Sequence, residues 1–189
     1  MLGAIKYGLT HLLDFNGRDA RQTFWYYVLF VYIVGQAISM SAMIGPMMRM
    51  MRNMFDVAAL QDQQRILAEQ QAFIQELTGP IIYLTAAATL FNLLALAAAF
   101  VRRLHDSDLS GWWALVVGAL QAAITTMTLY NMRDMLAMFG APDAAMHADM
   151  STFVLMALTG YIPLALFIYL GARKSTDGPN RFGAEPVRF

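Results

Sequence analysis

Four stretches of the chain are continuously apolar and long enough to cross a membrane. They cover residues 24–44, 81–101, 112–130 and 153–172, and none contains Asp, Glu, Lys, Arg or His. Because a helix rises ~1.5 Å per residue, about 20 residues cross the ~30 Å hydrocarbon core of a bilayer. A charge at mid-helix costs roughly 2.5–3.5 kcal/mol on insertion scales, so uncharged runs predict transmembrane helices. The expected fold class is an all-α, integral membrane four-helix bundle.

The polar segments between these spans differ in length and pattern. Residues 47–78 are rich in Gln, with apolar positions near helical spacing. This pattern predicts an extra amphipathic helix in the first outer loop, ended by Gly79 and Pro80. The helix would lie on the membrane, or extend the first span outward and fold back. Residues 102–111 form a short connection, and residues 173–189 form a tail, so the whole chain is expected to be a single membrane domain.

Composition narrows the function classes. The chain has 189 residues, of which 58% are hydrophobic and 14% charged, whereas soluble domains have about 25% charged residues. A formal net charge of zero gives no reason to expect a nucleic-acid partner. The absence of cysteine excludes a disulfide framework and a thiolate metal site.

Lys and Arg are distributed unequally between the two sides of the predicted bundle. Nine lie before the first span, in the connection between spans two and three, or in the tail, and four lie in the two opposite segments. The positive-inside rule therefore predicts that both termini are cytoplasmic. The nine are Lys6, Arg18, Arg21, Arg102, Arg103, Arg173, Lys174, Arg181 and Arg188, and the four are Arg49, Arg52, Arg65 and Arg133.

Three motifs on the predicted cytoplasmic side combine arginine, aromatic and small residues. They comprise residues 15–25, residues 102–113 and residues 180–183. In these motifs the chain resembles the bacterial domain-of-unknown-function 805 family of small inner-membrane proteins, and the resemblance covers nearly the full chain. The resemblance implies a protein of the bacterial inner membrane, and because the family's biochemical activity is not established, it assigns no catalytic residues to this chain. The matching residues are Phe15, Gly17, Arg18, Arg21, Trp25, Arg102, Arg103, Leu104, His105, Asp106, Ser110, Gly111, Trp112, Trp113, Asn180, Arg181, Phe182 and Gly183.

Two interpretations of these motifs stay open. In the first, they contact one another and form a structural polar cap at the ends of the helices. In the second, the arginines bind an anionic lipid headgroup or phosphate, since a guanidinium can donate two hydrogen bonds at once. Arg102 and Asp106 are four apart and can pair on a helix, while Arg103 competes for the same carboxylate. The candidate residues are Arg18, Arg21, Arg102, Arg103, His105, Asp106, Trp112, Trp113, Asn180 and Arg181.

A metal or catalytic site is not expected at the inner motifs. His105 lies near Asp106 and Asp108, but the other histidines are His11 and His147, and a stable metal site needs three or four protein ligands. We therefore expect neither a cofactor nor an enzyme.

Methionine suggests a separate metal hypothesis for the outer segments. Thioethers are ligands that Cu(I) prefers, and helical spacing could bring several together. The simpler interpretation is that Met is a flexible apolar filler of amphipathic helices. The methionines are Met47, Met48, Met50, Met51 and Met54 in the first outer segment, and Met132, Met135, Met138, Met146 and Met150 around the second.

The expected function is that of a non-enzymatic inner-membrane protein. Its cytoplasmic cap of Arg, Trp and Asn would bind anionic membrane lipid or a partner protein, and a second copy of the chain is a further candidate partner. The alternative is a small channel or transporter subunit, in which an oligomer would supply further helices. That alternative needs a polar path past Gln36 and Asn92, which otherwise would face the bundle and hydrogen-bond another helix.

Overall fold

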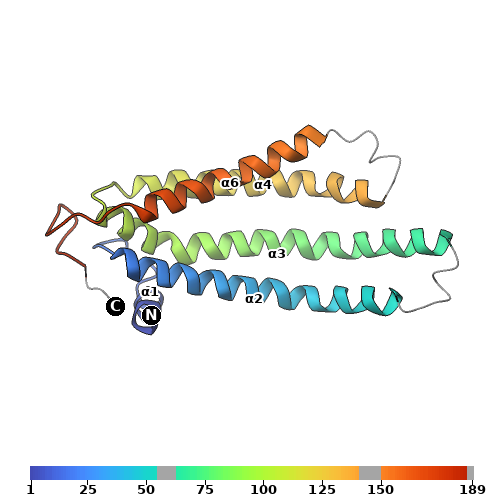
Figure 1. Cartoon of the computed structure of the whole chain (residues 1–189), viewed down its shortest axis with the longest axis horizontal. Helices are drawn as coiled ribbons and strands as arrows, with labels where there is room; N and C mark the ends of the chain where they lie inside the picture. The colour runs from blue at the N-terminus through green and yellow to red at the C-terminus, as the bar shows by residue number, and fades with distance from the viewer. Residues whose placement is uncertain (55–62, 141–149, 187–189) are drawn as a thin grey trace.

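A computed structural model describes residues 1–54, 63–140 and 150–186 of the chain. Four long helices run side by side, and a short N-terminal helix lies at the end where both termini are found (Figure 1). No β-strand is present in the described residues, so the predicted all-α class is confirmed. The helices are α1 (Leu2–Thr10), α2 (Arg21–Met54), α3 (Gln63–Asp106), α4 (Trp112–Gly140) and α6 (Met150–Ala172).

Three of the helices are long and apolar enough to cross a membrane. These stretches are Arg21–Arg49, Gln71–Asp106 and Trp112–Met132, and they include the first three predicted spans. The fourth predicted span lies inside α6, whose apolar stretch Ala157–Ala172 is shorter than the other three. By length and composition, the chain is therefore a membrane protein with at least three candidate crossings.

The first outer segment does not form a separate amphipathic helix in the described residues. Instead α2 extends beyond the first span, and α3 begins early and passes through Gly79 and Pro80. The prediction that these two residues end a helix is therefore wrong. A proline removes one backbone hydrogen bond, but apolar helices tolerate this because the rest of the ladder continues. Arg49 and Glu76 form an ion pair across the two extensions, and residues 55–62 lie outside the described residues.

The buried core is concentrated at the end of the molecule that carries both termini. Phe100 and Phe167 lie with their ring centroids 4.6 Å apart, and Phe24 packs against both. Further along the helices, large apolar side chains such as Leu94 and Tyr130 are exposed, as expected where lipid covers a helix. The buried core residues are Phe24, Tyr27, Val31, Ala99, Phe100, Leu104, Val117 and Leu170.

Helix α1 was not predicted from the sequence. It packs on α2 through Gly8, where an added Cβ would lie 2.4 Å from the Tyr27 ring. The Tyr27 hydroxyl in turn donates a hydrogen bond of 3.1 Å to the Ala95 carbonyl of α3. The short helix therefore rests on the pair formed by α2 and α3.

The two mid-span carboxamides behave differently. Gln36 is exposed and makes no hydrogen bond with the described residues, so the prediction that it faces the bundle is wrong. The buried face of α2 runs through Tyr27 and Val31, four residues apart, and this spacing continues to Gly35 rather than to Gln36. Asn92 of α3 is half-buried and lines a cavity between the helices.

Candidate functional site

The three sequence motifs meet at the closed end of the bundle. The linker from α1 to α2, the last turn of α3 and the tail after α6 bring five charged side chains together, each at most 5% exposed. We call this group the polar cap. It consists of Arg18, Asp19, Arg102, Arg103 and Asp106.

Asp106 joins two arginines from different segments. Its Oδ1 accepts hydrogen bonds from Arg18 Nε at 3.2 Å and Nη2 at 3.0 Å, and its Oδ2 accepts one from Arg103 Nη1. All three side chains are fully buried. Of the two arginines expected to compete for Asp106, Arg103 therefore forms the pair and Arg102 does not. Successive side chains on a helix point about 100° apart, so Arg102 faces the α1 side while Arg103 faces the tail.

Arg102 instead forms an ion pair with Asp19. Its Nε lies 3.0 Å from Asp19 Oδ1, and its Nη1 donates to the carbonyls of His11, at 2.8 Å, and of Asp14. The guanidinium lies over the Tyr7 ring, 5.4 Å from its centroid, within the range of a cation–π contact. Burial raises the pKa of the Asp19 carboxyl, and hydrogen bonds from Arg102 and Tyr7 oppose that rise by stabilising the anion.

The other two arginines hold the tail against α3. Arg103 Nε donates to the Gly171 carbonyl at 2.9 Å, near the end of α6. Arg18 donates to the carbonyls of Thr176 at 2.8 Å and Gly178 at 2.7 Å. Both guanidinium groups are thus committed to carbonyls of the same chain as well as to Asp106.

The tail contains a turn that packs against His105. Asn180 and Gly183 exchange two backbone hydrogen bonds of 3.0 Å, which close the turn. The Asn180 side chain donates to the His105 carbonyl at 2.8 Å. The imidazole stacks on Phe182 with centroids 3.9 Å apart, and its Nδ1 lies 3.2 Å from the Gly17 carbonyl. His105 therefore connects the linker to the tail.

The remaining candidates lie at the surface. Arg181 forms an exposed ion pair of 3.0 Å with Asp108. Trp112 is 73% exposed and Trp113 is also exposed, and both lie at the start of α4. Arg21 is exposed at the first residue of α2. Seven of the ten candidates thus form or adjoin the polar cap, while Arg21 and the two tryptophans do not.

Sequence reasoning did not select Asp19 or Thr176 as site residues. Asp19 directly follows Arg18 in the first motif, so its position was a usable signal. Thr176 donates its backbone N–H and its hydroxyl to the Asp106 carbonyl, at 2.9 and 3.0 Å. Nothing in the composition of the tail distinguishes Thr176 from its polar neighbours.

A small polar pocket lies beside the cap. Its volume is about 260 Å³, and its walls are the start of α2 and the beginning of the tail. Arg21 and Lys174 contribute two cations, and Asp177 contributes one carboxylate. The distance between Lys174 Nζ and Asp177 Oδ2 is 3.3 Å. The first helical hydrogen bond of α2 is donated by Phe24, so the preceding backbone N–H groups have no intrahelical acceptor. The rim pocket, as we name it, is lined by Ala20, Arg21, Gln22, Lys174, Ser175 and Asp177.

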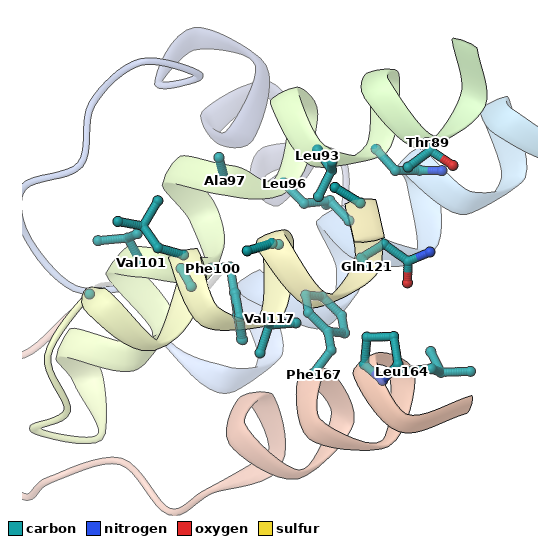
Figure 2. Close-up of a pocket in the computed structure, with 18 of the residues that line it drawn as sticks. Thr89, Leu93, Leu96, Ala97, Phe100, Val101, Val117, Gln121, Leu164 and Phe167 are labelled. Carbon is teal, nitrogen blue, oxygen red and sulfur yellow. The ribbon is translucent and has the colours of Figure 1, made fainter. Parts of the chain in front are cut away.

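A much larger apolar cavity lies between the long helices. Its volume is about 1060 Å³, and α2, α3, α4 and α6 all contribute to its walls. Figure 2 shows Val101 at one end and Thr89 and Gln121 at the other, with Leu164 and Phe167 along one side. We refer to this cavity as the membrane groove.

A comparison with models of protein families identifies the family of this chain. A family model described as a protein of unknown function, DUF805, matches residues 12–184. The chain belongs to the DUF805 family. The DUF805 match contains all three cap motifs, whereas α1 lies before it. No curated protein and no solved structure matches the chain.

The structure describes only part of the residues on which a metal site could depend. Among the described residues, no three His, Asp or Glu side chains are grouped closely enough to hold a metal ion. In the Met-rich segments, Met47 and Met48 are exposed on α2. Most of the second cluster falls on side chains outside the described residues, so the Cu(I) hypothesis stays a prediction.

Proposed function

We propose that this chain is a non-enzymatic protein of the bacterial inner membrane that binds an anionic lipid at its cytoplasmic face. In this proposal α2, α3, α4 and α6 all cross the bilayer as a four-helix bundle, with both termini in the cytoplasm. The observation that carries the proposal is the rim pocket, which is lined by two cationic residues, Arg21 and Lys174, and by a single acidic residue, Asp177.

The buried arginines do not bind the lipid in this proposal. Arg18 and Arg103 have fully buried side chains that are hydrogen-bonded to their own chain. Their role is to position the tail wall of the rim pocket. Arg103 Nη1 lies 3.4 Å from the Ser175 hydroxyl, and Arg18 holds the Thr176 carbonyl. The cap therefore fixes where Lys174 lies relative to the start of α2.

The chemistry of the rim pocket suits a phosphate-bearing headgroup. Two cations against one carboxylate leave a net positive charge. Backbone N–H groups at a helix N-terminus favour anions, because they lack partners and carry the positive end of the helix dipole. Exposed Trp112 and Trp113 support a location at headgroup depth, where tryptophan is enriched.

Lipid retention tests the proposal. The protein would be reconstituted with phosphatidylglycerol and phosphatidylethanolamine, and bound lipid counted by native mass spectrometry. The double substitution Arg21→Gln/Lys174→Gln is expected to weaken phosphatidylglycerol binding roughly 30-fold, from about 1 kcal/mol per cation. The matched control Lys6→Gln/Arg173→Gln removes two exposed cations of the same end from outside the pocket. Equal loss in both double variants, or none in either, would refute a specific site.

A channel or transporter subunit remains the alternative. It requires a polar path past both mid-span carboxamides. Asn92 lines the membrane groove, but Gln36 does not, and most groove residues are apolar. The observations therefore favour lipid binding over conduction.

A further inference from the structure

The membrane groove has a depth that matches one leaflet of the bilayer. At one end it is lined by Ser110 and Trp112 at the start of α4, and at the other by Gln121 of the same helix. Gln121 lies nine positions after Trp112 on α4, a rise of about 14 Å, and Val101 lies twelve positions after Thr89 on α3, a rise of about 18 Å. Half of a hydrocarbon core is about 15 Å. The groove therefore extends from the membrane boundary to the middle of the membrane.

The deep end of the groove is polar. Gln121 Nε2 donates to Thr125 Oγ1 at 3.1 Å, and the Thr89 and Thr125 hydroxyl oxygens are 3.4 Å apart. The carboxamide of Asn92 lines the same end and makes no hydrogen bond with the described part of the chain. An amide without a partner is costly in hydrocarbon, where no water replaces the missing bond. Asn92 thus has two N–H donors available to a bound molecule.

This arrangement selects against an ordinary phospholipid. A phospholipid keeps its charged headgroup at the interface, so only the methyl end of an acyl chain would reach Asn92. A neutral lipid can instead place a carbonyl at this depth, because no charge holds it at the surface. The wall residues Leu96, Val117 and Phe167 would contact its hydrocarbon.

We propose that the membrane groove binds a neutral lipid bearing a carbonyl group, which accepts a hydrogen bond from Asn92 Nδ2 near the middle of the membrane. A volume of about 1060 Å³ is slightly above the ~300–1,000 Å³ usual for ligand sites. Two sources share this chemistry, a quinone with an alkyl or prenyl chain and a diacylglycerol. The inference is independent of the rim pocket, which binds a charged headgroup at the surface.

Equilibrium binding to the purified protein in nanodiscs tests this assignment, with decyl-substituted benzoquinone and dioleoylglycerol as separate probes. Asn92→Leu removes the carboxamide at similar size. We expect Asn92→Leu to weaken the binding of whichever probe the wild-type protein binds by about threefold to tenfold. This is the usual range for the loss of one hydrogen bond. Gln36→Leu makes the same change at an exposed mid-span position outside the groove, and is expected to leave binding unchanged.

A steric pair completes the experiment. Ala122 and Ala123 are adjacent and both exposed on α4, but only Ala122 lines the groove. Ala122→Phe is expected to reduce binding strongly and Ala123→Phe to leave it unchanged, while Arg21→Gln/Lys174→Gln retains the neutral lipid. The proposal is overturned if neither probe binds, if Asn92→Leu binds as wild type does, or if Ala122→Phe instead breaks a dimer formed through the groove.

Discussion

At the scale of single residues, the polar cap raises a problem of charge balance. It buries three guanidinium groups with only two carboxylates. The excess is compensated by carbonyl groups at helix C-terminal ends. Arg103 donates a hydrogen bond to the Gly171 carbonyl near the end of α6, and Arg102 donates one to the His11 carbonyl just after α1. Such ends carry about half a negative charge. The buried arginines are therefore stabilised by helix ends as well as by Asp19 and Asp106.

Asp106→Asn tests how strongly the cap depends on its central carboxylate. The substitution leaves Arg18 and Arg103 buried without an anion, and breaking a buried pair costs about 3–5 kcal/mol. We expect a clear decrease in the midpoint of thermal unfolding in detergent. Asp177→Asn is the matched control, because its ion pair with Lys174 is almost fully exposed and should contribute little. Equal midpoints for the two variants would contradict the structural role of Asp106.

At the scale of elements, the sequence predicted those features that depend on a local pattern of residues, namely the positions of the long apolar helices. Uncharged apolar runs located the membrane helices, because each run must by itself satisfy the hydrocarbon core. The ends of the helices were harder to predict from the sequence. Gly79 and Pro80 are typical of a turn, but α3 continues through Pro80 because the helical hydrogen bonds on either side of it are kept. The pairing of Arg102 with Asp19 joins residues 83 positions apart. No local spacing encodes such a pair, so the motifs could be located but their contacts could not.

Helix α1 offers a test of how a short element is held in place. It has only nine residues, and isolated helices of this length are marginal. Gly8→Ala would place a methyl group within the Tyr27 ring, and overpacking of this kind costs about 1–3 kcal/mol. We expect α1 to detach, with faster hydrogen exchange of its amides. Gly3→Ala makes the same change at an exposed position of α1 and should leave exchange unchanged or slower.

At the scale of the whole molecule, burial is polarised along the bundle. The core and the polar cap are both at the end that carries the termini, and the helices expose large apolar side chains toward the other end. The α6 helix has few contacts with α2 and α3, compared with the extensive contacts between α3 and α4. The cap therefore adds a connection between α6 and the other helices, because Arg103 of α3 donates to the Gly171 carbonyl of α6.

The same polarity predicts how the chain is oriented in a membrane. Among the described residues, eight Lys and Arg residues lie at the capped end and four lie in the far halves of α2, α3 and α4, and the positive-inside rule depends on this bias. Tags on the N- and C-termini are therefore expected to resist a membrane-impermeant protease in intact cells. A tag inserted between α2 and α3 should be cleaved in the same cells, which confirms that protease reaches the outer side. Cleavage of both terminal tags would show the opposite orientation. Cleavage of one terminal tag alone would show an odd number of crossings, with α6 outside the bilayer.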